Sequence, residues 1–134
     1  MYVIDTNVLS ELRRREPNPA VVEWVEGADS VALYTTAVNL YEIKRGILSV
    51  PARDTSQITA LETWLDRILE WFEGKVLPLS ASSAIGAAEA QQRTSIELRD
   101  CMIGAIANEH KMTVVTRNIK HMSRVCDSVV NPWR

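Results

Sequence analysis

The chain has 134 residues, of which 46% are hydrophobic and 24% are charged, which is the balance expected of one globular domain with an apolar core. Its formal net charge of −2 excludes a protein that holds nucleic acid by an evenly basic surface. Any contact with phosphate must therefore depend on a metal ion or on a local basic cluster. Such clusters occur at residues 13–15, 44–45 and 117–124, and for the first two a solvated helix face is the simpler interpretation.

The cysteines and the N-terminal residues indicate the cellular setting. Cys101 and Cys126 stand outside any CxxC pair, which argues against a structural zinc site, and both thiols fit a reducing compartment. The apolar run that opens the chain stops at Asp5 and is too short for a signal peptide or a membrane span. We therefore expect a cytoplasmic protein that makes no use of a membrane.

Apolar runs and amphipathic stretches alternate along the chain. A short apolar run that ends in polar residues is typical of a buried parallel strand, whereas apolar residues spaced by three and four, as between Ile58 and Phe72, indicate a helix. Pro19 is suited to open a helix, and Thr36 to cap one. In chain order the sequence predicts a strand at 2–4, a helix to residue 15, a helix at 19–27, a strand at 31–35, a helix to about 49, a long helix at 53–73, a strand at 75–79, a helix from Ser80 or Ser82 to 93, a helix at 98–110, and strands at 112–116 and 128–130.

This order of elements predicts the fold class. Alternating strands and helices favour an α/β fold with a mostly parallel central sheet of four to five strands, flanked by helices on both faces. We expect residues 1–134 to form a single domain. In such folds ligands bind beyond the carboxyl ends of the strands, so polar residues that follow a strand are candidates for a functional site.

Three carboxylates occupy positions that suggest chemistry. Asp5 ends the first strand, Glu42 lies beside the apolar stripe of its helix, and Asp100 begins a helix that is apolar over its next two turns and is therefore expected to be buried. Each has a plain structural alternative: a helix cap for Asp5, a solvated side chain for Glu42, and a cap or a pair with Arg99 for Asp100.

Further polar residues lie near these acids in the expected fold. Thr116 and Asn118 follow the fourth strand, and Glu97 is one helical turn before Asp100. Hard oxygen ligands on several separate elements suit Mg²⁺ or Mn²⁺, and the chain lacks the cysteine and histidine spacing of a zinc site. An ion of this kind can bind a phosphodiester and activate water. The combination therefore indicates phosphodiester chemistry more strongly than any one residue does.

Four segments of the chain resemble the PIN-domain family, in particular the VapC/FitB-like toxins of prokaryotic toxin–antitoxin pairs. They occur in the order expected of that family and span nearly the whole chain: MYVIDTNVLSEL, TTAVNLYEIKRGI, RDCMIGAIANEHKMTVVTRN and VVNPW. The resemblance implies a PIN-like fold that cleaves single-stranded RNA with a carboxylate-bound Mg²⁺ or Mn²⁺ ion. It also implies a homodimer and an antitoxin partner that inserts a segment near the active site.

The resemblance assigns roles to individual residues. Asp5, Glu42 and Asp100 match the acids of the family's site, and Asp5 and Asp100 are expected to bind the ion. Asn118 matches the position after the fourth strand and is expected to orient the attacking water, giving a 5′-phosphate and a 3′-hydroxyl. The residues expected to support the site or to contact RNA are Thr6, Asn7, Glu97, Thr116, Arg117, Lys120 and His121.

One position departs from the family's pattern. His121 stands where many relatives carry an acid, which argues against a second tightly held metal ion. Lys120 and His121 contact phosphate in one interpretation and are merely solvated in the other. On the long helix, Trp64 and Trp71 form a second row beside the apolar stripe, for which core packing is the simpler interpretation and a groove for an antitoxin helix the alternative.

Other functions stay open at this stage. The chain can be a PIN-like binding module with weak catalysis, or a metal-dependent nuclease that cuts DNA, because nothing in the sequence indicates recognition of the 2′-hydroxyl. A phosphatase of the haloacid dehalogenase type is disfavoured, because Asn7 stands where that chemistry needs a second aspartate. A receiver domain is disfavoured as well, because no pair of acids adjoins the first strand.

Overall fold

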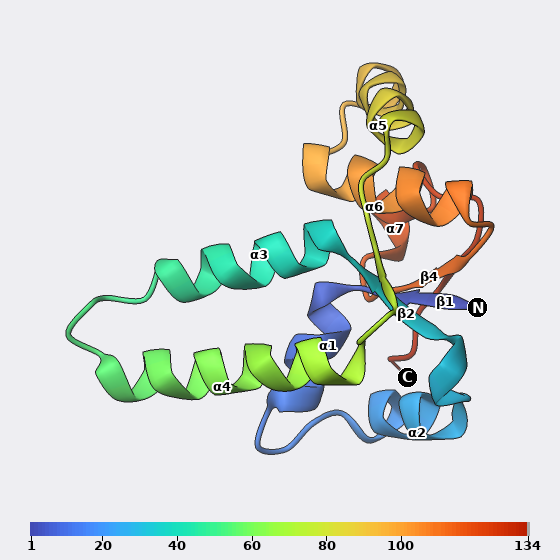
Figure 1. Cartoon of the computed structure of the whole chain (residues 1–134). Coiled ribbons are helices and arrows are strands. Elements are labelled where there is room, and N and C mark those ends of the chain that lie inside the picture. The colour runs from blue at the N-terminus through green and yellow to red at the C-terminus, as the bar shows by residue number, and fades with distance from the viewer. Residues whose placement is uncertain (134) are drawn as a thin grey trace.

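Side chains alternate between the two faces of a strand, so a buried strand needs cover on both sides. The computed structural model, which describes residues 1–133, shows a five-stranded sheet with helices on both faces (Figure 1), which confirms the predicted fold class. Every neighbouring pair of strands is parallel. The strands are β1 (Tyr2–Ile4), β2 (Leu33–Thr36), β3 (Val76–Leu77), β4 (Thr113–Val115) and β5 (Val129–Val130), in the spatial order β3-β2-β1-β4-β5.

The helices divide the core into two clusters. Val3 and Val114 pack on one face of the sheet with the buried side chains of α5 and α6, whereas Ile4 and Val115 pack on the other face with those of α1 to α4. This division follows from the period of two along each strand. The helices are α1 (Thr6–Arg13), α2 (Pro19–Gly27), α3 (Ala37–Leu48), α4 (Thr55–Trp71), α5 (Ala81–Thr94), α6 (Leu98–Glu109) and α7 (Ile119–Met122).

The strand order brings three carboxyl ends together at one edge of the sheet. β1 lies between β2 and β4, and the N–H of Asp5 continues the pairing by donating to the Val115 carbonyl at 3.0 Å. On the other side, the Thr35 hydroxyl donates to the Ile4 carbonyl at 3.3 Å. The first residues of α1 and α3 and the turn after β4 therefore meet in space, although they are far apart in the sequence.

The predicted elements are present, with shifted ends. The second strand begins at Leu33 rather than residue 31, because the Asp29 carboxylate accepts from the Val31 N–H and caps a 3-10 turn over Ser30–Ala32. α1 ends at Arg13, two residues early, where the chain turns extended. The sequence prediction did not include α7, which is a single turn and offers no apolar period to detect.

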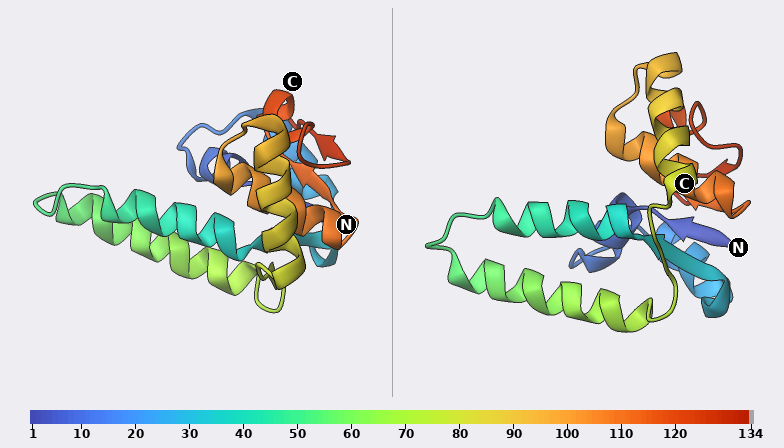
Figure 2. Two further views of the ribbon diagram at one scale, coloured as in Figure 1. Left: turned by 90° about the horizontal axis from the view of Figure 1, so that it is seen from above. Right: turned by 45° about the horizontal axis from the view of Figure 1, so that its top comes forward.

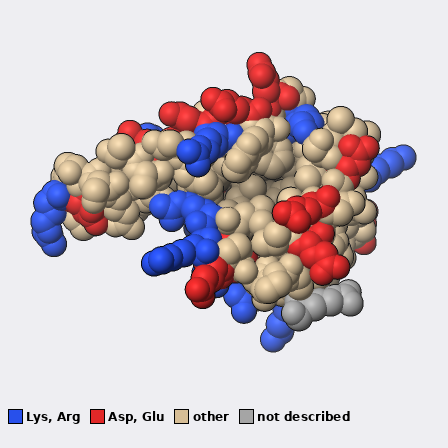
Figure 3. Space-filling view, turned by 90° about the horizontal axis from the view of Figure 1, so that it is seen from below, with Lys and Arg blue, Asp and Glu red and all other residues tan. Residues whose placement is uncertain are grey.

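α3 and α4 run side by side in opposite directions and project beyond the sheet as an arm (Figures 1 and 2). Basic and acidic side chains lie next to each other at the tip of this arm (Figure 3). Core packing was the wrong expectation for Trp71, which is 59% exposed, whereas Trp64 is partly buried against the core. Among residues 1–133 no helix, α4 included, combines the length and the apolar character needed to cross a membrane.

Close packing around Gly104 gives the first testable prediction. A Cβ atom at this position of α6 would lie 2.5 Å from the carbonyl oxygen of Val125, a backbone atom that has no rotamer with which to move away. We expect Gly104→Ala to destabilise the fold by about 1–3 kcal/mol, despite the better helix propensity of alanine. Chemical denaturation measured by circular dichroism would show the loss.

Gly86→Ala is the matched control. The added Cβ would lie 3.8 Å from the Ala105 side chain, an ordinary contact, so alanine should be neutral or stabilise α5 by up to about 1 kcal/mol. Equal denaturation midpoints for the two variants would contradict the close approach at Gly104.

Candidate active site

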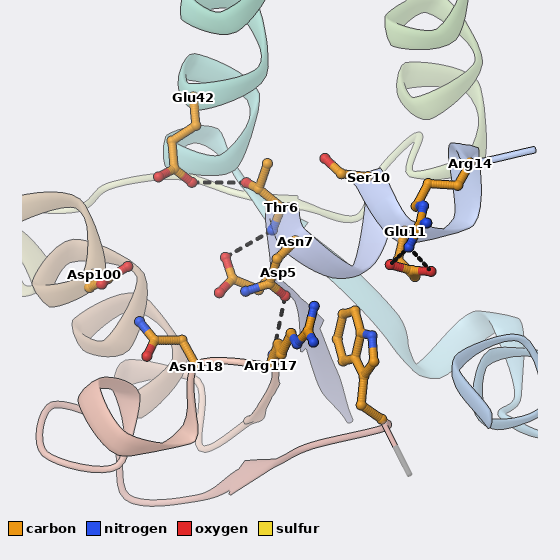
Figure 4. Close-up of a pocket in the computed structure, with 11 residues that line it drawn as sticks. Asp5, Thr6, Asn7, Ser10, Glu11, Arg14, Glu42, Asp100, Arg117 and Asn118 are labelled. Atoms are coloured by element: carbon orange, nitrogen blue, oxygen red, sulfur yellow. Dashed lines mark hydrogen bonds and ion pairs between the residues drawn. The ribbon is translucent and has the colours of Figure 1, made fainter. Parts of the chain in front are cut away.

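The predicted acids line one hollow at the carboxyl edge of the sheet. Asp5 follows β1, Glu42 lies on α3 and Asp100 lies in the first turn of α6, and all three border a cavity of about 520 Å³ together with Asn118. Figure 4 shows these side chains around a common space, each from a different element. The placement that the sequence predicted for these acids is therefore observed.

Asp5 is the most deeply held of the three, with 5% of its surface exposed. One carboxylate oxygen accepts from the Thr6 N–H at 2.8 Å and from the Asn39 side-chain amide at 3.0 Å, and the other accepts from the Thr116 hydroxyl at 2.8 Å. Burial raises the pKa of Asp5, and these three donors oppose the rise. Asp5 is thus both the N-cap of α1 and an acid that borders the hollow, so its two interpretations hold together.

Asn39 is a site residue that the sequence analysis missed. Its side chain is fully buried, and its amide nitrogen donates both to Asp5 and to the Thr6 hydroxyl at 3.0 Å. Its carbonyl oxygen accepts from the Thr36 hydroxyl at 2.7 Å and also from the Thr36 backbone N–H at 3.3 Å, the second of which completes the capping box of α3. Asn39 therefore connects the start of α3 to the acid that follows β1. The only signal in the sequence was an asparagine three residues after the capping Thr36.

Glu42 is held at the opening of the hollow by a hydroxyl and a cation. One oxygen accepts from the Thr6 hydroxyl at 2.8 Å, and the other lies 3.8 Å from Nε of Arg99. Burial raises the pKa of Glu42, and the charges of Asp5 and Asp100 raise it further. A simple solvated side chain, the alternative considered for Glu42, does not describe this arrangement.

Asp100 carries the clearest electrostatic signature of the site. Burial, together with the negative charges of Asp5 and Glu97, raises its pKa to about 6. The structural alternatives for Asp100 are wrong: Glu97 is the N-cap of α6, and Arg99 donates to Glu97 at 2.8 Å. Asp100 is therefore a half-buried acid held beside other acids.

The turn after β4 is fastened to α1 through one hydroxyl. The Thr116 hydroxyl accepts from the Asn7 side-chain amide at 3.0 Å and from the Asn118 N–H at 3.1 Å. Asn7 in turn accepts from the backbone N–H of Arg117 at 3.2 Å. The Asn118 amide lies 3.2 Å from Nδ1 of His121, which fixes its direction beside the hollow.

A model of the PIN-domain family matches residues 2–127 of the chain. The chain belongs to the PIN-domain family. Two similar proteins are VapC ribonuclease Y4jK of Sinorhizobium fredii, 34% identical with 99% of this chain and 98% of the relative covered, and toxin FitB of Neisseria gonorrhoeae, 30% identical with 99% of both covered. Among solved structures, that of FitAcB from Neisseria gonorrhoeae aligns with a TM-score of 0.89 at 30% identity and covers 100% of this chain and 99% of the other.

The oxygen donors of this PIN domain fit a hard divalent ion. Carboxylates and a side-chain amide carbonyl are ligands that Mg²⁺ and Mn²⁺ accept. Within residues 1–133, no three His, Cys, Asp or Glu side chains lie close enough to hold an ion among themselves. An ion in this hollow would therefore have one or two carboxylate ligands and several water ligands, which is the coordination that Mg²⁺ usually has in proteins.

Not every predicted residue borders the hollow. Glu97 and Lys120 are exposed outside its lining, and His121 reaches it only through Asn118. Conversely, the lining includes side chains that the sequence analysis did not assign to the site; Ser10 and Glu11 share one face of α1 with Asn7 at helical spacing, and Arg14 follows that helix. These additional residues are Ser10, Glu11, Arg14 and Trp133.

The buried amide of Asn39 gives a second prediction. Asn39→Ala would remove the donor to Asp5 and the donor to the Thr6 hydroxyl, and would leave the Thr36 hydroxyl without its acceptor. We expect a loss of about 2 kcal/mol in the free energy of unfolding. Urea denaturation would measure it, with Gln92→Ala, an exposed amide of α5, as a control expected to stay within about 0.5 kcal/mol. Equal losses in both variants would contradict the role of Asn39.

The raised pKa of Asp100 predicts a pH-dependent gain in stability for Asp100→Asn. The ionised carboxylate is less favourable in the folded protein than in the unfolded chain, so its cost grows as pH rises from about 4 to about 6 and is constant above. Because the group is half-exposed, solvent screening limits the cost to on the order of 1 kcal/mol. Without metal at pH 7.5, Asp100→Asn should melt a few degrees above the unchanged protein.

Thermal melts in a chelator across this pH range would make the measurement, with Asp66→Asn, an exposed carboxylate of α4, as the control. The difference for Asp100→Asn should disappear below about pH 4, where both forms are neutral. A melting temperature at pH 7.5 equal to or below that of the unchanged protein would overturn the electrostatic account of Asp100.

Proposed function

We propose that this PIN domain is a metal-dependent endoribonuclease and the toxin of a toxin–antitoxin pair. The observation that carries the proposal is the single hollow bordered by Asp5, Glu42 and Asp100, in a chain similar over nearly its whole length to a VapC ribonuclease and to toxin FitB. An acidic chain needs a cation to hold RNA, and these oxygens suit one. RNA in the cytoplasm is the substrate that this activity would meet.

Each residue of the site has a defined task in the proposed reaction. Asp5 and Asp100 would bind Mg²⁺ or Mn²⁺, and Glu42 would close the site beside them. When bound, the ion would supply Lewis-acid stabilisation of the charge that develops on the phosphodiester. The side-chain amide of Asn118 would accept a hydrogen bond from the water that attacks phosphorus in line, leaving a 5′-phosphate and a 3′-hydroxyl.

The hydrogen-bonded neighbours keep these groups in place before the substrate arrives. Asn39 and Thr116 hold the two oxygens of Asp5, and Thr6 holds Glu42. A site whose groups are already oriented loses little energy to rearrangement during the reaction. The same bonds explain how three acids can be kept near one another in the absence of an ion.

The partner of the toxin is proposed to be an antitoxin protein. Solved structures similar to this chain include a toxin–antitoxin complex from Klebsiella pneumoniae and VapBC-1 from nontypeable Haemophilus influenzae, at 21% and 17% identity. We place the antitoxin contact at the groove of about 280 Å³ between α1 and α4, which Leu12, Trp64 and Trp71 border. An exposed tryptophan beside leucines is a suitable anchor for an apolar helix face. A homodimer of this chain is also proposed, on the family resemblance alone.

Asp5→Asn tests the proposed function directly. The amide keeps the size of the side chain and one oxygen to cap α1, but it removes the charge that an ion needs. We expect Mn²⁺-dependent cleavage of single-stranded RNA to fall at least about 100-fold while the circular dichroism spectrum stays unchanged. Gel analysis of RNA fragments, with 5′-end chemistry determined by sequencing, would measure it.

Glu62→Gln is the matched control, because Glu62 is an exposed carboxylate of α4 away from the hollow. This variant should cleave RNA as the unchanged protein does. Full activity of Asp5→Asn would remove the assignment of the site. Cleavage of single-stranded DNA but not of RNA would change the proposed substrate from RNA to DNA.

A further inference from the structure

The hollow has two ends of opposite charge. Asp5, Glu42 and Asp100 gather at one end, whereas Arg14 and Arg117 lie at the other (Figure 4). The acids account for an ion, but an ion site has no need of guanidinium groups. Guanidinium groups in the lining indicate that a negatively charged group binds beside the reacting phosphodiester.

The hollow continues past the arginines toward the start of α2. A second cavity of about 430 Å³ shares Arg14, Arg117 and Trp133 with the first and extends along residues 16–19. The two cavities form one trough that leads from the acids across the end of α1. A trough of this kind suits a chain that extends beyond the reacting bond rather than a compact ligand.

The cationic end is held by a buried carboxylate. Glu11 is 6% exposed, accepts from the Asn18 N–H at 2.8 Å, and lies 3.2 Å from an Arg14 guanidinium nitrogen. The Asn18 N–H, with Arg14 and Arg117, lowers the pKa of Glu11, so it stays ionised at neutral pH. Glu16 also borders the second cavity, so the carboxylates equal the guanidinium groups in number. Arg14 is paired with Glu11, but among residues 1–133 Arg117 forms no ion pair, which leaves its charge available to a phosphate.

An aromatic ring lies beside the cations. The Arg117 guanidinium carbon is 5.3 Å from the centroid of the Trp133 ring. The backbone N–H of Trp133 donates to the Asn131 side chain at 2.9 Å, and the backbone N–H of Arg117 donates to the Asn7 side chain, so the backbone of both residues is held in place. A guanidinium group next to an indole is the combination that binds a phosphate together with an unpaired base.

We propose that Arg14, Arg117 and Trp133 form a nucleotide subsite, in which the arginines bind a phosphate next to the one that is cleaved and the Trp133 indole stacks on a base. This subsite rests on the proposed ribonuclease function and specifies its substrate class. Stacking on a side chain requires a base free of a complementary strand, so the trough selects single strands. RNA that is long enough to occupy the subsite should bind more tightly than RNA that ends at the reacting phosphodiester.

Steady-state cleavage of a fluorogenic single-stranded RNA in Mn²⁺ tests the subsite. Arg117→Ala and Trp133→Ala should each raise KM about tenfold with kcat within about twofold, and Trp133→Phe should restore most of the loss. Arg117→Ala should also reduce the dependence of affinity on salt concentration by about one contact. Anisotropy titrations of the same RNA with Asp5→Asn as the uncleaving background would measure binding apart from chemistry.

Arg93→Ala is the matched control, because Arg93 is an exposed arginine of α5 that borders neither the acidic hollow nor the cavity beside it. The variant removes the same charge elsewhere on the surface and should leave KM for RNA unchanged.

Each outcome decides between the proposals. If the unchanged protein cleaves RNA and the subsite variants keep its KM, or lose only kcat, the subsite is wrong and the ribonuclease function stands. An equal rise in KM for Arg93→Ala would show that any lost positive charge weakens binding, and would overturn the subsite. Loss of affinity only for an inhibitor protein would assign the trough to that partner. Failure of the unchanged protein to bind or cut RNA would remove both proposals.

Discussion

The structure depends on the burial of one ionisable group, the carboxylate of Asp5. A buried carboxylate is costly unless donors satisfy it, and here the donors come from α1, α3 and the end of β4. The parallel order of β2, β1 and β4 makes this possible, because it brings the segments that leave these strands to one edge. The constraint that stabilises Asp5 is therefore also the one that builds the hollow, and the fold and the site share a single set of hydrogen bonds.

The acids of the site lower the stability of the metal-free protein and favour the binding of a cation. Burial raises the pKa of Asp5, Glu42 and Asp100, and the negative charges of neighbouring acids raise it further at Glu42 and Asp100, so ionisation of these carboxylates costs the folded protein stability. A divalent ion would offset that repulsion, which makes ion binding favourable for the same reason that the metal-free site is strained. The arginines at the far end of the trough supply positive charge at a distance from the acids, where a bound ion would not neutralise a phosphate.

The sequence predicts those features that depend on neighbouring residues. The strand before Asp5, the cap at Thr36 and the apolar helix after Asp100 follow from local patterns, and the meeting of the acids at one edge follows from the parallel order of the strands. Features that depend on packing escaped prediction. Asn39 meets Asp5 across 34 positions, and its role appears only once α3 lies against β1. The exposure of Trp71 likewise depends on how far α4 extends beyond the sheet.

The central claim is that Asp5, Glu42 and Asp100 serve one ion beside a phosphodiester. Crystals of the protein grown with Mn²⁺, measured at a wavelength where manganese scatters anomalously, would test it most directly. The account predicts an anomalous peak in the hollow, in contact with carboxylate oxygens of Asp5 and Asp100 and absent from crystals of Asp5→Asn. A peak at another place, or a hollow without manganese at a saturating concentration, would contradict it.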